Sequence, residues 1–321
     1  MSLPPSHIRV GLIGSGRHGR GIIEPALRLA PINVVATCSL HDVPVTPGPR
    51  HYNGHQQMLA AESGNLDACI VVVPAAAYRR VLADVLACGL PVWSEKPAAA
   101  NAEDAQFLEE AALRAGRPLV VGFNKRFATA YGMAAAAMRR PEFGQPTSFF
   151  GKFMVGARYY DDEGSYLVDN PIHIIDLARF FMGEVSAVHA ERAAIREGRE
   201  GQWSYAVTLR FDGGAVGMLQ FGNTQSWQQH NEFVEITGEG HAITVDNLVR
   251  YRFRPEVGPE EFWEPNFTVP TERNHSLVLA GYAGQFSHFA EVVRNGVAPR
   301  ATIADARKAL ELVDEIRRQT G

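Results

Sequence analysis

The chain has 321 residues, and because single domains cluster at roughly 100 to 150 residues, this length predicts two domains. Hydrophobic residues make up 46% of the sequence and charged residues 21%, and the formal net charge is −4, which is typical of a globular protein with a sizeable core. No basic stripe is present, so we expect no nucleic acid partner.

Targeting signals and metal motifs are also missing from the sequence. The first ten residues lack the apolar stretch of a secretory signal, and no run approaches the roughly 20 apolar residues that span a bilayer. The three cysteines, Cys38, Cys69 and Cys88, have no zinc-site spacing, and each lies in an apolar segment, where a small buried side chain is expected. We therefore expect a cytoplasmic protein without a bound metal.

The first third of the chain alternates β-branched runs with helical patterns, which is typical of βαβ units around a parallel sheet. Strands are predicted over 8–14, 32–39, 67–74, 90–95 and 117–123. Helices are predicted over 18–30, 55–63, 76–88 and 102–115, the last with Asn101 as N-cap and Gly116 beyond its end. Residues 44–54 are predicted to be a loop, and the run 67–74, apolar on both faces, to be central. Residues 1–122 are thus expected to form a doubly wound α/β dinucleotide-binding (Rossmann) domain.

Beyond residue 122 the pattern changes to long strands separated by turn signals. Strands are predicted over 148–155, 186–195, 203–211, 215–222, 231–238, 241–246 and 248–254. Helices are predicted over 124–140, 171–183, 281–296 and 303–319. Residues 123–321 are therefore expected to form an α+β domain with a large, mainly antiparallel open sheet that binds substrate. Because such a sheet has one face without helices, we expect that face to bury against another subunit in a homodimer or homotetramer.

A glycine-rich motif follows the first predicted strand. The sequence Gly14-Ser15-Gly16-Arg17-His18-Gly19 is a G-x-G-x-x-G pattern between a strand and a helix. The first glycine permits a tight turn, the second lets a pyrophosphate approach the backbone, the third allows close helix packing, and helix N–H groups bind the anion. Together with the βαβ units, this motif predicts a bound NAD or NADP.

The end of the second strand normally distinguishes these two cofactors. An NAD-binding domain usually places an acid there, about 20 residues after the glycines, to bind the ribose 2′-hydroxyl. This chain has Ser39 at that position, so no carboxylate would repel a 2′-phosphate. We therefore expect a slight preference for NADP, with Ser39, His41 and Arg50 as candidate phosphate contacts.

Two further strand ends supply candidate site residues. Pro74 ends the central strand, and Ser94-Glu95-Lys96-Pro97 follows the next one, at the carboxyl edge where open α/β sheets bind ligands. We expect Pro74, Glu95 and Lys96 to contact the cofactor. Because Pro97 restricts the backbone of Lys96, this lysine is fixed where it can stabilise an alkoxide and share its proton.

These motifs, taken together, resemble one family. The glycine motif, Glu95-Lys96-Pro97, Gly122-Phe123-Asn124 with Arg126-Phe127, and Asp169-x-x-x-His173-x-x-Asp176 are similar to the glucose-fructose oxidoreductase, inositol dehydrogenase and rhizopine-catabolism (Gfo/Idh/MocA) family. The resemblance runs nearly end to end. It implies NAD(P)-dependent oxidation of a sugar or cyclitol, with Lys96, Asp169 and His173 in catalysis. After Pro74 the chain reads Ala75-Ala76-Ala77 where many relatives have an asparagine and a histidine, which affects only the surroundings of the cofactor.

The residues around His173 are consistent with a catalytic base. Asn170 can cap a helix that starts at Pro171, which places His173 in the first turn. There the helix dipole disfavours the imidazolium, while Asp169 can orient the ring and offset that effect. Asp176, one turn further, has either a supporting or a structural role.

The substrate is expected to contact Lys96, Asp169 and His173. Arg126, Arg158 and Tyr159 are also expected to bind the substrate. Tyr166, Trp227 and His230 have suitable polar or aromatic chemistry, and for these three, as for Arg158 and Tyr159, a core or surface role is the alternative. The expected reaction is hydride transfer between nicotinamide C4 and a carbinol carbon, with His173 as base, Lys96 stabilising the alkoxide and Asp169 orienting the pair. The alternatives are a non-catalytic dinucleotide sensor or scaffold on the same fold, and a methyltransferase, which would leave the three residues unexplained.

Overall fold

The computed structural model describes residues 7–39, 48–156, 160, 162–195, 197–226, 231–268 and 271–321, without the side chain of residue 274. It divides into two compact units. The first unit is Met1–Asn124 with Gly281–Lys308, and the second is Lys125–Ala280 with Ala309–Gly321. The first unit therefore includes a late helix that the division at residue 122 assigned to the second domain.

The first unit is built on a six-stranded sheet in the order β3-β2-β1-β4-β5-β6, and all its strand pairs are parallel. The strands are β1 (Ile8–Ile13), β2 (Ile32–Cys38), β3 (Arg50–Tyr52), β4 (Ala68–Val71), β5 (Val92–Ser94) and β6 (Leu119–Val121). The doubly wound parallel sheet is confirmed, and the strand order reverses between β1 and β4, where such sheets bind ligands. The predicted loop 44–54 is wrong in one part, since β3 pairs with β2.

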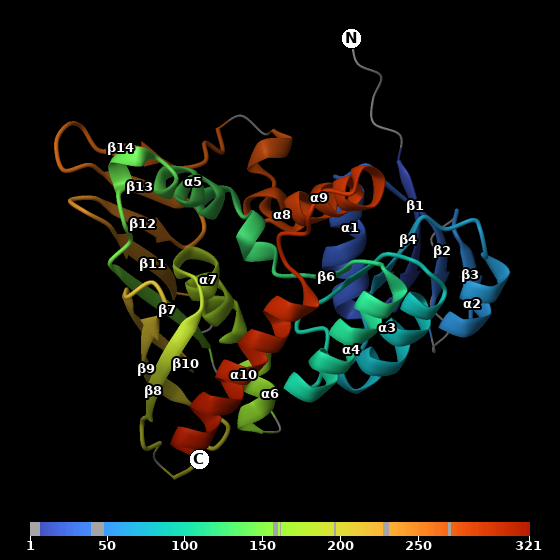
Figure 1. Cartoon of the computed structure of the whole chain (residues 1–321), viewed down its shortest axis with the longest axis horizontal. Helices are drawn as coiled ribbons and strands as arrows, with labels where there is room; N and C mark the ends of the chain where they lie inside the picture. The colour runs from blue at the N-terminus through green and yellow to red at the C-terminus, as the bar shows by residue number, and fades with distance from the viewer. Residues whose placement is uncertain are drawn as a thin grey trace. The chain divides into compact units, whose positions relative to one another are not determined.

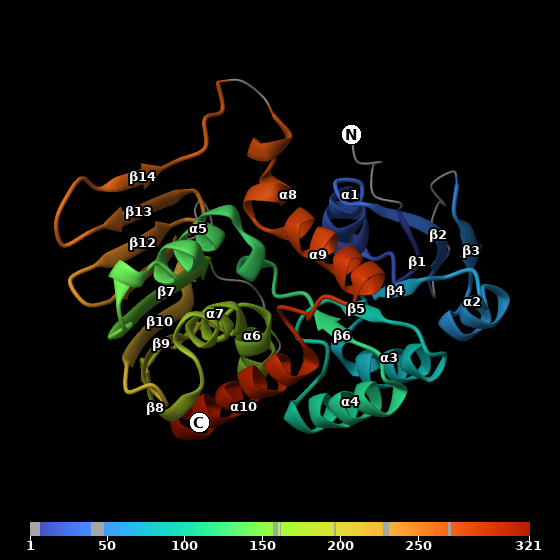
Figure 2. The same cartoon turned by 45° about the horizontal axis from the view of Figure 1, so that its top comes forward.

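Helices cover both faces of this sheet. Figures 1 and 2 show α1 and α9 on one face, with α2, α3 and α4 on the other. The first unit contains α1 (Glu24–Leu27), α2 (His55–Ala61), α3 (Tyr78–Ala87), α4 (Ala102–Ala115) and α9 (Tyr282–Asn295). The predicted helix 18–30 begins with a π-helical turn, η1 (Gly19–Ile23). Both predicted caps of α4 are confirmed: Asn101 accepts from the Asp104 N–H, and Gly116 is left-handed.

The second unit is built on an eight-stranded sheet in the order β14-β13-β12-β11-β7-β10-β9-β8, in which only β7 and β10 pair in parallel. Its strands are β7 (Ser148–Gly156), β8 (Val185–Arg192), β9 (Ser204–Phe211), β10 (Val216–Gln225), β11 (Asn231–Thr237), β12 (Ala242–Asp246), β13 (Arg250–Arg254) and β14 (Glu261–Trp263). The mainly antiparallel sheet is confirmed. β14 was not predicted.

One face of the second sheet is covered and the other is open. Buried and exposed residues alternate along β9, β10 and β13, and α5 (Thr129–Met138) and α7 (Ile172–Met182) pack on the buried face (Figure 2). The remaining helices are α6 (Glu163–Asp169), α8 (Ser276–Leu279) and α10 (Ile303–Thr320), of which α6 and α8 were not predicted. Within the residues that the structure describes, no helix is long and apolar enough to cross a membrane.

Candidate active site

The glycine motif forms the turn after β1, at the point where the strand order reverses. Gly14 has a φ of 97°, and its N–H donates to the carbonyl of Cys38 at 2.9 Å. A Cβ on Gly14 would lie 2.0 Å from the carbonyl oxygen of Val72, and one on Gly19 would lie 2.9 Å from the carbonyl oxygen of Gly14. A side chain is therefore excluded at Gly14 because the turn is packed against the backbone after β4, and disfavoured at Gly19 because the helix start is packed against the turn itself.

The same turn leaves space where a dinucleotide phosphate would approach. A Cβ on Gly16 would meet no atom within 4 Å, so the backbone faces open space there. The hydroxyl of Ser15 is buried and has no hydrogen-bond partner among the described residues. A buried hydroxyl without a partner is energetically costly, and a bound phosphate oxygen would satisfy it. The residues present therefore fit the pyrophosphate of a nicotinamide dinucleotide.

Glu95 links the glycine turn to the end of β5. Its side chain is 8% exposed, with Oε1 3.1 Å from Nε2 of His18 and Oε2 accepting the backbone N–H of Lys96 at 2.9 Å. Burial raises the pKa of the neighbouring Tyr78 phenol, and the Glu95 charge adds to that effect. Glu95 thus brings together two of the predicted motifs, while Arg17 is exposed and Lys96 is half-buried.

The residues expected to distinguish NADP from NAD lie at the β2 and β3 ends. Ser39 follows β2, and its N–H donates to the carbonyl of Tyr52 at 3.3 Å. Arg50 is the first residue of β3 and pairs with Ala36, two residues before the end of β2. Its guanidinium binds the Glu62 carboxylate through two hydrogen bonds of 2.5 and 2.6 Å. Arg50 therefore forms an ion pair within the unit, with its side chain still 56% exposed.

Glu62 is the centre of this small cluster. Its side chain is 1% exposed and also accepts from the Tyr52 hydroxyl at 2.6 Å and the Asn65 amide at 2.9 Å. The Arg50 guanidinium lowers the pKa of Glu62 to about 2. Pro74, expected to end the central strand, lies three residues beyond the end of β4, and its carbonyl accepts the N–H of Ala77 at 2.9 Å. His41 lies outside the described residues.

In the second unit, Asp169 and His173 flank a break between two helices. Asp169 is the last residue of α6, and His173 is the second residue of α7, in the first turn as predicted. The His173 N–H donates to the carbonyl of Asn170 at 3.1 Å. The predicted side-chain cap by Asn170 is wrong, because α7 has no side-chain cap hydrogen bond; the Asn170 amide instead donates to Asp169 Oδ2 at 3.3 Å and to the Tyr160 hydroxyl. Pro171 stands at the N-cap position of α7 instead.

Arg126 is not directed to solvent. Its Nε and Nη2 bind the two carboxylate oxygens of Asp176 at 2.9 and 2.6 Å, and both side chains are at most 5% exposed. Its neighbour Lys125 pairs with the buried Glu232, which also accepts from the hydroxyl of Tyr131 at 2.7 Å. The predicted substrate candidate Arg126 and the helix residue Asp176 thus form a buried structural pair, one turn from His173.

The aromatic candidates divide in the same way. Tyr166 is fully buried and stacks on Trp203 and Tyr205, so it belongs to the core of the second unit. Arg158, Tyr159, Trp227 and His230 lie outside the described residues. Sequence reasoning missed Tyr160, whose hydroxyl donates to Asp169 Oδ2 at 2.8 Å. Its only signal was its place beside the predicted Tyr159.

The expectation that all three cysteine side chains are buried is correct for two of them. Cys38 and Cys69 are buried, and burial raises the pKa of Cys38 to about 11. Cys88 is exposed at the end of α3, so the expectation of a buried side chain is wrong there. All three cysteines are free thiols.

Each of the two units contains a region that matches a known family of domains. Residues 8–123 match the oxidoreductase family with an NAD-binding Rossmann fold, and residues 133–244 match the GFO/IDH/MocA C-terminal domain. The scyllo-inositol 2-dehydrogenase (NAD(+)) of Bacillus subtilis is 26% identical, over 78% of this chain and 74% of that protein. The D-apiose dehydrogenase of Paraburkholderia graminis is 25% identical, over 94% of this chain and 85% of that protein. A dehydrogenase structure from Chromobacterium violaceum superposes with a TM-score of 0.86 at 21% identity, covering 99% and 96%.

Proposed function

Because this chain belongs to the GFO/IDH/MocA family of oxidoreductases, we propose that it transfers a hydride between a nicotinamide and the carbinol carbon of a sugar, cyclitol or sugar derivative. The observation that carries the proposal is the glycine turn, closed by Gly14 and open beside Gly16 and Ser15. The substrate class follows the relatives, which are named for inositol and apiose. Cofactor binding is assigned to the first unit and substrate binding to the second.

The chain's own residues would hold the cofactor as follows. The backbone of Gly14, Ser15 and Gly16 would bind the pyrophosphate, and the Ser15 hydroxyl would donate to one of its oxygens. Glu95 would keep the glycine turn and the Lys96 backbone in a fixed relation through His18. The nicotinamide, when bound, supplies a carbon that accepts or gives a hydride.

Three side chains carry the proposed chemistry. His173 removes the hydroxyl proton of the substrate in the oxidative direction. Lys96 donates to the oxygen as negative charge develops on it. Asp169 orients the imidazole and supports the charge that the ring acquires. His173 suits this role because the first turn of α7 disfavours a standing positive charge, so the ring is available as a base.

We also propose that NAD is the preferred cofactor, in place of the slight preference for NADP expected from the sequence. Arg50 pairs with Ala36, two residues before the end of β2, and its guanidinium forms two hydrogen bonds to Glu62. Withdrawing it would leave the buried Glu62 charge without its cation, which is costly. Of the three expected phosphate contacts, only Ser39 and His41 then remain, and neither is a permanent cation.

The proposal is tested by titrating the wild-type protein with NADH and NADPH, followed by oxidation of a polyol panel. We expect nicotinamide fluorescence to report binding of NADH at least several-fold tighter than NADPH. With NAD saturating, at least one cyclitol or sugar should give reduced cofactor. Equal or tighter binding of NADPH would refute the preference. Binding without any turnover would favour the sensor, and no binding of either cofactor would reject the oxidoreductase.

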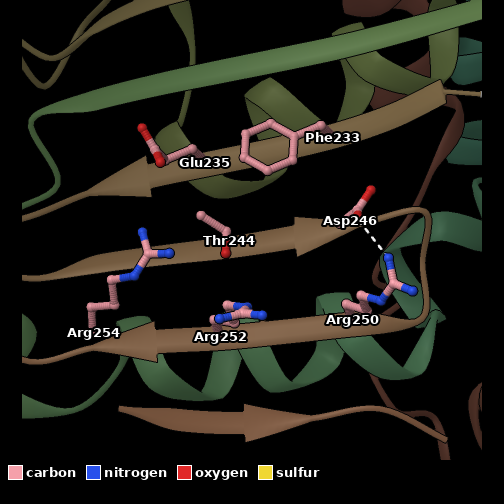
Figure 3. A pocket seen from close by; sticks show the side chains of 7 residues that line it. All are labelled: Phe233, Glu235, Thr244, Asp246, Arg250, Arg252 and Arg254. Atoms are coloured by element: carbon pink, nitrogen blue, oxygen red, sulfur yellow. Dashed lines mark hydrogen bonds and ion pairs between the residues drawn. The ribbon is translucent and has the colours of Figure 1, made fainter. Parts of the chain in front are cut away.

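The open face of the second sheet is the proposed contact with a second copy of the chain. Its middle carries apolar side chains, and Val216 and Met218 of β10 are each 49% exposed. Figure 3 shows the adjoining region, a pocket of about 290 Å³ lined by acidic and basic side chains of β11, β12 and β13. Arg250 pairs there with Asp246 at 3.3 Å. A face with an apolar middle beside charges of both signs is suited to an isologous interface.

Met218→Lys is therefore expected to convert the oligomer to a monomer, because the substitution places a charge in the apolar middle of the interface. Light scattering at micromolar concentration measures the mass of both proteins. The matched control is Leu113→Lys, on α4 of the first unit, where the side chain is 77% exposed. A wild-type monomer, or an unchanged mass in Met218→Lys, would contradict this assignment of the interface.

A further inference from the structure

Tyr160, which has no part in the proposed reaction so far, forms a hydrogen bond to Asp169, one of the three proposed catalytic residues. The Tyr160 hydroxyl donates to Asp169 Oδ2 at 2.8 Å. The Asn170 amide donates to the same hydroxyl and, at 3.3 Å, to the same carboxylate oxygen. Asn170 is 8% exposed, so this group of three is partly shielded from water. Hydrogen bonds to a charged acceptor in such surroundings are stronger than those between neutral groups.

The ring of Tyr160 is held by other aromatic side chains. It lies edge-on to Tyr166, with ring centroids 5.4 Å apart and an interplanar angle of 68°. Tyr166 in turn stacks on Trp203, at 5.4 Å and 18°, and is fully buried. Because Tyr166 is fixed in a buried stack and contacts the Tyr160 ring, the Tyr160 hydroxyl is held near Asp169 in a restricted geometry.

The contact also reaches the turn that carries His173. Asn170 binds the Tyr160 hydroxyl through its side chain, and its backbone carbonyl accepts the N–H of His173 at 3.1 Å. The same hydroxyl therefore contacts the carboxylate of Asp169 and the side chain of Asn170, whose carbonyl binds the His173 N–H. A hydrogen bond on Oδ2 selects one rotamer of Asp169 and leaves the acceptor capacity of Oδ1 for another donor.

We propose that Tyr160 is a positioning residue for the reaction: its hydroxyl fixes the Asp169 carboxylate so that Asp169 can orient His173. This inference rests on the proposed function, because it assigns Tyr160 a role through Asp169 and His173. Tyr160 touches neither the substrate nor the cofactor in this role. Because the proposed reaction removes the substrate hydroxyl proton during hydride transfer, loss of Tyr160 acts on that combined step and leaves the binding of both molecules intact.

The test is Tyr160→Phe, which removes the hydroxyl and keeps the ring. We expect kcat to fall by roughly ten-fold, the effect of one hydrogen bond to a charged group, while KM for the substrate and Kd for NADH change less than two-fold. The primary deuterium isotope effect on kcat should not decrease, and should rise if product release limits the wild type, because the slowed step includes hydride transfer. A packing defect alone would not produce this split.

The matched control is Tyr166→Phe. The hydroxyl of Tyr166 is buried without a hydrogen-bond partner among the described residues, so its removal deletes an oxygen from the same aromatic group without touching Asp169. Tyr166→Phe should keep the wild-type kcat. An unchanged kcat in Tyr160→Phe, or equal losses in both variants, would overturn the positioning role.

Failure of the proposed function gives a different result. If the wild-type protein binds NADH and oxidises no polyol, both the reaction and the role of Tyr160 are rejected. If the wild type turns over and Tyr160→Phe matches it, only the role of Tyr160 is rejected. Thermal unfolding of the two variants, expected within a few degrees of the wild type, verifies that each protein is folded.

Discussion

Replacement of His173 with alanine is expected to lower turnover by about 100- to 10,000-fold, the usual effect of losing a positioned acid or base. NADH affinity should change little, because the proposed role of His173 is on the substrate proton, while the glycine turn is assigned to the pyrophosphate. The measurement is single-turnover hydride transfer with cofactor saturating, which separates chemistry from binding and release. The control is His7→Ala, an exposed histidine before β1, which should retain the wild-type rate.

Lys96→Ala extends this experiment. A comparable loss is expected because no cation would then offset the developing alkoxide charge. The double variant should lose much less than the product of the two single effects, since both groups serve one proton-transfer event. Rates near wild type in both single variants would mean that Lys96, Asp169 and His173 are structural. The sensor would then be the better account of the chain.

Much of the fold could be predicted because it depends on local patterns. The runs that became β1, β2 and β4 are long and apolar, and the caps of α4 are set by residues next to the helix. The missed elements are short. β3 and β14 have three residues each and α6 has seven, and unlike β5 and β6, which are also three residues long, they do not lie in an apolar run. Pairing with a neighbouring strand, which the sequence does not display, makes β3 and β14 strands.

The site was predicted less completely, for a related reason. The glycine motif and the Glu95-Lys96 dipeptide are contiguous, so their spacing is visible in the sequence. The ion pair of Arg126 joins residues 50 positions apart, and that of Arg50 joins residues 12 apart. Neither ion pair could be predicted from neighbouring residues, since the sequence does not show whether an arginine faces solvent or a buried carboxylate. Tertiary packing therefore gives both arginines a carboxylate partner that the sequence did not reveal, Asp176 for Arg126 and Glu62 for Arg50.

The glycine turn gives the second large effect. Gly14→Ala is expected to destabilise the protein by at least about 2 kcal/mol, because it combines a strained positive φ with a buried clash. The φ of Gly14 is 97°, and the added methyl would lie 2.0 Å from the carbonyl oxygen of Val72. That oxygen belongs to the backbone after β4, which cannot move without disturbing the centre of the sheet. Urea unfolding, monitored by circular dichroism, measures the loss.

Gly16→Ala is the matched variant two residues along the same turn. Its methyl would meet no protein atom within 4 Å, so the free energy of unfolding should stay within about 0.5 kcal/mol of the wild type. NADH affinity should nevertheless fall at least ten-fold, since the methyl occupies the space through which the pyrophosphate approaches the backbone. An unchanged NADH affinity in a folded Gly16→Ala protein would mean that the cofactor does not lie on this turn. The two variants therefore separate the glycine that closes the turn from the glycine that admits the ligand.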